Sequence, residues 1–167
     1  NLDRAKLQAV CEEVSAAGHP VQLANLNSPG QIVISGSAEG VKLAGEKAKA
    51  AGAKRVLPLN VSGPFHSSLM KPAAEKLKGV LSGISVQDAK MPVVANVNAR
   101  PVTEAAAIVE KLVEQVAAPV LWEDSVQWMA ESGVTTFVEI GPGKVLAGLI
   151  KKTAPAETRV YSVQDME

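Results

Sequence analysis

Cysteine, histidine and aromatic residues are scarce in this chain, which has one cysteine, two histidines and 3% aromatic residues among its 167 residues. A single cysteine cannot form an internal disulfide, and cysteine and histidine nowhere show the spacing of a zinc site. Seventeen basic residues balance seventeen acidic ones, so no excess of cations is available to neutralise nucleic acid phosphates. No apolar run approaches the roughly 20 residues that span a bilayer. These absences argue against a metal, a nucleic acid or a membrane as the main ligand, and they favour a cytoplasmic location.

The sequence also lacks a G-x-S-x-G elbow, which would present a serine nucleophile after a strand. It does contain His66, in the stretch GPFHSSLM at 63–70, where a predicted strand ends and a predicted helix begins. Such connections often carry reactive groups, and a neutral imidazole can accept and return a proton near neutral pH. We interpret Ser67 and Ser68 as caps of the following helix rather than as nucleophiles. His66 is therefore a candidate base without an evident nucleophile to activate.

Small and apolar residues are abundant, and 47% of the residues are hydrophobic. This composition suits helices packed on a largely buried sheet. In the first 61 residues, apolar positions at helical spacing follow a possible N-cap at Asp3. The predicted elements are a helix over 3–17, strands over 21–26 and 31–35 around an NSPG turn, a helix over 38–51 and a strand over 55–61. This order is that of a ferredoxin-like domain without its first strand, so we expect the chain to begin part-way through a domain.

Residues 62–167 show alternating helical and strand patterns, which predict a parallel α/β sheet. Pro72 favours a short turn before the regular part of a helix that ends at 81. Thr103 is the expected cap of a helix that must end before Pro119. The remaining predicted elements are a strand over 91–97, a helix over 124–132, a buried strand over 135–140, a helix after a GPG turn and a strand over 159–163.

Four other sites have simple structural interpretations. His19 is expected in a surface turn, and Cys11 is expected to be a buried, inert thiol on the first helix. The GPGK stretch at 141–144 is not a P-loop, because the required glycine and hydroxyl residue are replaced by valines, so it predicts a tight strand-to-helix turn. Lys54 and Arg55 form either a solvated pair or a site for an anionic carrier.

Several motifs occur in an order that resembles one known family. They are NSPGQ at 27–31 with VISG at 33–36, AGAKR at 51–55, PFHSSLMKPA at 64–73 and EIGPGKVL at 139–146. Together they are similar to the C-terminal half of a bacterial malonyl-coenzyme A:acyl-carrier-protein transacylase, over essentially the whole chain. The resemblance implies part of an α/β-hydrolase-like acyltransferase domain, at 62–167, and a truncated ferredoxin-like lobe, at 1–61.

The same resemblance implies a ping-pong transfer of a malonyl group from coenzyme A, through a serine ester, to the phosphopantetheine thiol of acyl carrier protein in fatty acid biosynthesis. It makes His66 the base and Gln115, through its main-chain carbonyl, the group that orients the histidine. The nucleophilic serine belongs to the N-terminal half of such enzymes, so we expect this chain to need that half as a partner and to be inactive alone. No cofactor is implied, since malonyl-CoA and the carrier protein are substrates.

Five further positions are candidates for substrate binding by the resemblance. Phe65 would crowd an α-methyl branch, a discrimination worth about 1–3 kcal/mol. Lys54 and Arg55 correspond to residues that face coenzyme A phosphates or the acidic carrier protein, and Asn27 and Asn96 are candidates for lining the cleft. Two alternatives stay open: a fragment of a polyketide synthase acyltransferase domain, and a non-catalytic module that binds an acyl carrier or another anion.

Overall fold

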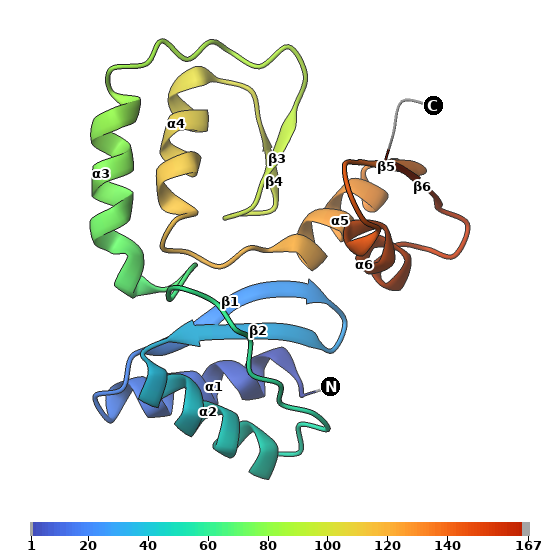
Figure 1. Ribbon diagram of the computed structural model, residues 1–167. Coiled ribbons are helices and arrows are strands. Elements are labelled where there is room, and N and C mark those ends of the chain that lie inside the picture. Colours follow the sequence, from blue (N-terminus) through green and yellow to red (C-terminus); the bar gives the residue numbers. More distant parts are fainter. Residues whose placement is uncertain (1, 165–167) are drawn as a thin grey trace.

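The computed structural model describes residues 2–164 as a mixed α/β structure with two-stranded sheets (Figure 1). In chain order the elements are α1 (Arg4–Ala16), β1 (Val21–Ser28), β2 (Gln31–Gly36), α2 (Ala38–Ala50), the 3₁₀ helix η1 (Ser68–Met70), α3 (Lys71–Leu81), β3 (Val93–Ala95), β4 (Arg100–Val102), α4 (Ala105–Glu114), α5 (Trp122–Glu131), β5 (Thr136–Ile140), α6 (Val145–Thr153) and β6 (Arg159–Val163). The mixed α/β class predicted from the sequence is confirmed.

The first unit is the antiparallel β1–β2 hairpin with α1 and α2 together on one face (Figure 1). Asp3 caps α1 as predicted, since its carboxylate accepts from the main-chain N–H groups of Ala5 and Lys6. Ser37 caps α2 in the same way. The apolar faces of both helices meet the hairpin in a core that includes Leu7, Cys11, Val14, Val21, Leu23, Leu26, Ala44 and Ala48.

The strand predicted over 55–61 is not formed, and this prediction was wrong. The segment has no regular secondary structure, and its apolar side chains are exposed, with Leu57 64% and Val61 62% accessible. A strand exists only when its N–H and C=O groups pair with a neighbour, and among residues 2–164 no strand pairs with this segment. The strand-like composition of residues 55–61 therefore did not produce a strand, because no neighbouring strand pairs with them.

After α3 the chain forms a short antiparallel hairpin, β3–β4, and then α4. The predicted strand over 91–97 shrinks to Val93–Ala95, and β4 was not predicted at all, since Arg100–Val102 contains a proline and is only three residues long. Thr103 is not the cap of α4. The main-chain N–H of Ala105, in the first turn, donates instead to the carboxylate of Asp88 at 2.8 Å.

Strands β5 and β6 form the only parallel pair among the described residues, so the predicted parallel pairing holds here and the other two sheets are antiparallel. Phe137 packs with α5 and α6, whereas Ile140 is 82% and Tyr161 53% exposed. The strand predicted to be buried is therefore covered on one face only. Helix α6 follows the GPG turn as predicted.

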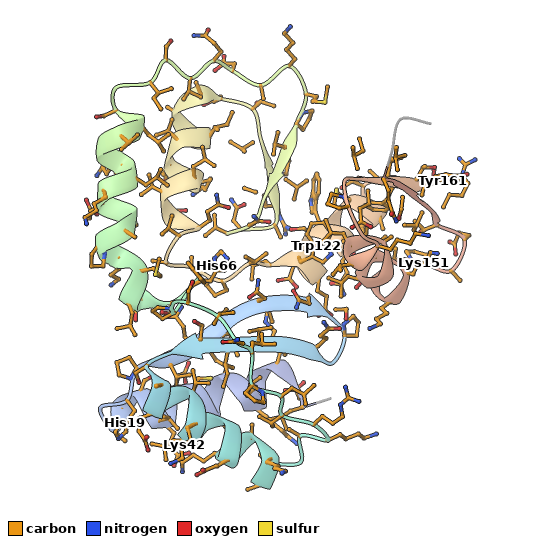
Figure 2. All side chains as sticks on the ribbon, viewed as in Figure 1. His19, Lys42, His66, Trp122, Lys151 and Tyr161 are labelled. Atoms are coloured by element: carbon orange, nitrogen blue, oxygen red, sulfur yellow. The ribbon has the colours of Figure 1, made fainter. Side chains whose placement is uncertain are left out.

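The hairpin unit is linked to the rest of the molecule along the free edge of β1. Asn25 forms a parallel bridge with Val120, whose N–H donates to the carbonyl of Ala24 at 2.8 Å. The guanidinium of Arg4 on α1 donates to both carboxylate oxygens of Asp124 on α5 at 3.0 Å. These contacts bring the segment that follows α4 against β1, with residue 66 at the same junction (Figure 2). The division at residues 61 and 62 stays a prediction.

Candidate functional site

His66 lies in the turn that leads from the irregular segment 55–64 into η1, at the junction of the β1–β2 hairpin with α3 and α4 (Figure 2). Its φ is +58°, in the left-handed region that a side chain with a Cβ occupies at a cost of about 1–2 kcal/mol. Such strain persists only where surrounding contacts enforce it, and it is concentrated at functional sites. The left-handed backbone conformation of His66 therefore marks this residue as a candidate functional residue.

The ring of His66 is held by the main-chain carbonyl of Gln115, which lies 2.9 Å from Nδ1. A carbonyl oxygen only accepts, so the proton of a neutral imidazole must sit on Nδ1 to make this hydrogen bond. Nε2 is then the unprotonated nitrogen and can accept a proton from a nucleophile. The contact between the two residues expected from the resemblance is present, while their catalytic roles stay a prediction.

The carbonyl of Gln115 is available because Gln115 is the C-cap residue of α4, where carbonyls have no partner within the helix. Its side chain is fixed as well, since Asn96 Nδ2 donates to Gln115 Oε1 at 3.0 Å. The carbonyl of Asn96 in turn accepts from the N–H of Leu121 at 2.8 Å. Asn96, expected to line a cleft, is thus placed behind Gln115 in a hydrogen-bonded chain that ends at the histidine.

The two serines that follow His66 do not cap a helix through their side chains. The hydroxyl of Ser67 is buried and donates to the carbonyl of Pro64 at 2.6 Å, which closes the turn from the inside. The main-chain N–H of Ser68 donates to Oε1 of Gln22 at 2.8 Å. The interpretation of the two serine side chains as helix caps was therefore wrong. The hydroxyl of Ser67 is buried and bonded within the turn, so it is not an exposed nucleophile.

Gln22 was not predicted as a site residue, yet its side chain contacts the histidine turn twice. Besides accepting from Ser68, it donates from Nε2 to the carbonyl of His66 at 3.3 Å. The only signal in the sequence was a polar residue between Val21 and Leu23, both of which are buried in the core. Alternation along a strand therefore placed Gln22 on the opposite face, but not against His66.

Phe65 directly precedes His66 and is 48% exposed, with its ring close to Gly63. Lys54 and Arg55 are exposed in the segment that follows α2, and Arg55 lines a hollow of about 100 Å³ with Gly30 of the hairpin turn. These basic residues lie toward the opposite end of the hairpin from Gln22. Asn27, half-buried on β1, is five positions from Gln22, or about 17 Å along the strand. Among the hydrogen bonds of His66 described above, none involves Lys54, Arg55 or Asn27, and their role in substrate binding stays a prediction.

The GPGK turn connects β5 to α6, and its glycines Gly141 and Gly143 have φ of 130° and 91°. The start of α6 does not offer a free anion site. Glu139 fills it, because its carboxylate oxygens accept from the N–H groups of Leu146 at 3.0 Å and Ala147 at 2.9 Å. The predicted strand-to-helix turn is confirmed, and a carboxylate of the chain itself satisfies the helix end.

Cys11 is 1% exposed in the core under the hairpin, as predicted. Burial, with a smaller contribution from Glu12, raises the pKa of its thiol from 9.0 to about 11. Within residues 2–164, no group of three His, Cys, Asp or Glu side chains could hold a metal ion. Over the same range, no helix combines the length and the apolar character needed to cross a membrane.

A family model described as the acyl transferase domain matches residues 3–166. The chain therefore belongs to the acyl transferase family. Within that family, it is 60% identical to the malonyl CoA-acyl carrier protein transacylase of Bacillus subtilis (strain 168), over 151 residues that make up 90% of this chain and 48% of that protein. The family inferred from the sequence motifs is confirmed.

Solved structures give the same result. An acyl-carrier-protein S-malonyltransferase from Burkholderia pseudomallei 1710b matches with a TM-score of 0.94 and 48% identity, over 99% of this chain and 53% of that chain. A malonyl-transacylase in complex with a type II PKS acyl-carrier protein matches with a TM-score of 0.92 and 47% identity, again over 99% and 53%. The chain thus spans about half the length of the relatives it matches.

Proposed function

We propose that this chain supplies the proton-transferring histidine of a malonyl transacylase, which moves a malonyl group from coenzyme A to the phosphopantetheine thiol of acyl carrier protein. The observation that carries the proposal is the 2.9 Å contact between Nδ1 of His66 and the carbonyl of Gln115. It leaves Nε2 as the basic nitrogen, whichever molecule provides the nucleophile. The relatives supply the substrate class, since those matched are malonyl transacylases or malonyltransferases.

In this mechanism a serine attacks the malonyl thioester while Nε2 of His66 accepts its proton, and the same nitrogen returns the proton to the departing coenzyme A thiolate. The carrier thiol then attacks the malonyl-serine ester, with His66 taking and returning a proton in the same way. The imidazolium formed in each half-reaction keeps its Nδ1 hydrogen bond to the Gln115 carbonyl, so the ring does not need to turn. No cofactor takes part in these steps.

The nucleophilic serine is assigned to the other part of the complete enzyme. Ser67, the serine next to His66, is buried with its hydroxyl donated to Pro64, which supports that assignment. A further support is the outer face of β5–β6, where Ile140 is 82% exposed, because parallel strands are normally covered on both faces. The relatives are about twice as long as this chain, and we infer that their additional part covers this face.

Phe65 beside the histidine would disfavour a branched acyl group, which suits a malonyl substrate. Lys54 and Arg55 are exposed and would meet the phosphates of coenzyme A or the acidic carrier protein. The solved relative in complex with a carrier protein supports this type of partner. The relatives do not favour a non-catalytic module, and a cytoplasmic location stays a prediction.

The test uses a complete enzyme that contains this chain, incubated with malonyl-CoA and carrier protein, with transfer followed by intact mass spectrometry. We expect His66→Ala to lower the transfer rate by about 10²–10⁴-fold, since general acid–base catalysis contributes that much. His19→Ala is the matched control, because the second histidine lies beside α1 and α2, across the hairpin from His66 (Figure 2), and its loss should change the rate less than twofold. An unchanged rate in the His66 variant, with the fold intact by circular dichroism, would reject the proposal.

A further inference from the structure

The side chain of Gln22 joins the hairpin unit to the turn that carries His66. Its Nε2 donates to the carbonyl of His66 at 3.3 Å, and its Oε1 accepts from the N–H of Ser68 at 2.8 Å. One amide thus satisfies two main-chain groups, on the two sides of Ser67. We propose that Gln22 is a positioning residue, which fixes the backbone of His66 so that its ring meets the carbonyl of Gln115. This inference rests on the proposed function only for its effect on catalysis.

The turn needs such a support because its conformation is intrinsically unfavourable. His66 has a φ of +58°, and residues held there relax unless their neighbours prevent it. Three contacts act on the turn: Gln115 holds the ring, Ser67 ties the turn to Pro64, and Gln22 holds the peptide groups on either side of Ser67. Of these, only the Gln22 contact comes from the hairpin unit, so it also fixes where the histidine turn sits relative to that unit.

The position of Gln22 in β1 explains why its side chain reaches the turn. Its neighbours Val21 and Leu23 point into the core with α1 and α2, so Gln22 projects from the opposite face of the hairpin. Ala24 has no partner on β2, which marks a β-bulge two positions after Gln22, and bulges commonly occur beside active sites. The helix-covered face of the hairpin thus builds the core, while its other face contributes one amide to the histidine.

A glutamine side chain meets the hydrogen-bonding requirements of both main-chain groups. The carbonyl of His66 needs a donor and the N–H of Ser68 needs an acceptor, and a glutamine side chain carries one of each. Gln22→Glu keeps the acceptor and replaces the donor by a second oxygen that faces a carbonyl. Gln22→Leu is similar in size and removes both groups. Both variants therefore break the hydrogen bond to the carbonyl of His66, and only Gln22→Glu keeps an acceptor for the N–H of Ser68.

The first measurement reads the histidine directly, on the chain by itself, through the nitrogen chemical shifts of the His66 imidazole. In the unaltered chain we expect the signature of a neutral ring protonated at Nδ1 and unprotonated at Nε2. In Gln22→Leu we expect a mixture of the two tautomers, because the ring is no longer held against the Gln115 carbonyl. Gln127→Leu, at an exposed position of α5, is the matched control and should leave the signals unchanged.

The second measurement is the rate of malonyl transfer by the complete enzyme. We expect Gln22→Leu to lower kcat at least 10-fold with KM changed less than twofold, since misplacement of a catalytic group weakens the transition state more than substrate binding. Gln22→Glu should also lower kcat, because a carboxylate cannot donate to the carbonyl of His66. Unaltered imidazole signals, or an unaltered kcat where His66→Ala is inactive, would overturn the proposal. If His66→Ala keeps full activity, the proposed function fails, while the imidazole signals still decide whether Gln22 positions the ring.

Discussion

Cys11 shows how strongly one residue can couple to its surroundings in this small core. Its thiol is buried, and its pKa is raised from 9.0 to about 11, which means that the folded chain holds the thiol proton more tightly than the unfolded chain does. The stabilising contribution is therefore complete below pH 9 and is lost as the pH rises toward 11. Over that window the loss amounts to roughly 2 kcal/mol, from two pKa units at about 1.4 kcal/mol each with partial titration.

We accordingly predict that the free energy of unfolding, measured in urea, falls by roughly 2 kcal/mol more between pH 8 and pH 10.5 in the unaltered chain than in Cys11→Ala. The alanine variant starts from a lower value, because it leaves a cavity, but it has no thiol to ionise. Equal pH dependence in the two proteins would show that the thiol is not shielded from water. The same burial predicts slow alkylation at pH 8 in the folded chain.

The residues of the candidate site differ in how visible they are to sequence analysis. His66 stands out because it is one of two histidines and lies between a strand-like and a helical pattern. Gln115 contacts His66 through its main chain, a group that every residue possesses, so only the family resemblance pointed to it. Gln22 depends on a contact between segments far apart in the chain, and neither periodicity nor composition encodes that proximity. The positive φ of His66 could likewise not be predicted from the sequence.

Among the elements, helices were easier to predict than strands, because their end signals are local. The cap predicted at Asp3 is present, and the predicted ends of the first two helices, at 17 and 51, lie within one residue of the ends of α1 and α2. Strands need a partner, and this is where prediction failed. The segment 55–61 has strand-like residues and no pairing strand among residues 2–164, while Arg100–Val102 pairs despite a proline because β3 lies beside it.

Two glycines within helices, Gly40 and Gly79, have different surroundings and allow a matched comparison of glycine-to-alanine substitutions. A Cβ on Gly40 in α2 would lie 2.7 Å from the carbonyl oxygen of Pro20 and 2.8 Å from that of His19, both of them main-chain atoms. On Gly79 in α3 it would meet nothing within 4 Å. We predict that Gly40→Ala lowers the free energy of unfolding by about 1–3 kcal/mol, and that Gly79→Ala raises it by about 0.5–1 kcal/mol.

Chemical denaturation of the two variants and the unaltered chain, under one set of conditions, tests this difference in sign. Both changes add one methyl group to a helix, so intrinsic helix propensity is common to them and favours alanine in both. A stabilised Gly40→Ala variant would mean that α2 can move away from the turn at residues 19 and 20. A destabilised Gly79→Ala variant would contradict the open surroundings of α3.

At the scale of the whole molecule, the outer face of β5–β6 presents apolar side chains to solvent. Ile140, Val138 and Tyr161 are more than half exposed there, although strands of a parallel pair are normally covered on both faces. Apolar side chains gathered on a surface promote association and the binding of apolar dyes. We predict that Ile140→Asp lowers the fluorescence of an environment-sensitive apolar dye bound to the chain, without lowering its melting temperature.

Lys42→Asp on α2 is the control for this experiment, because it changes charge at an exposed position of the hairpin unit (Figure 2). Dye binding should be unaltered in that variant. If Ile140→Asp binds as much dye as the unaltered chain, the exposed face of β5–β6 does not form an apolar surface in solution. If the variant instead unfolds at a lower temperature, Ile140 is packed and the face is covered.

The support of His66 by a main-chain carbonyl has a consequence for genetics. Where a carboxylate side chain supports a catalytic histidine, a single codon change removes the acceptor, and alanine scanning identifies it. Here no codon at position 115 encodes a residue without a carbonyl, so the acceptor is inherited whatever amino acid stands there. A screen for loss of function should therefore recover changes at 66, and at 22 and 96 around it, while the group in direct contact with the imidazole escapes detection.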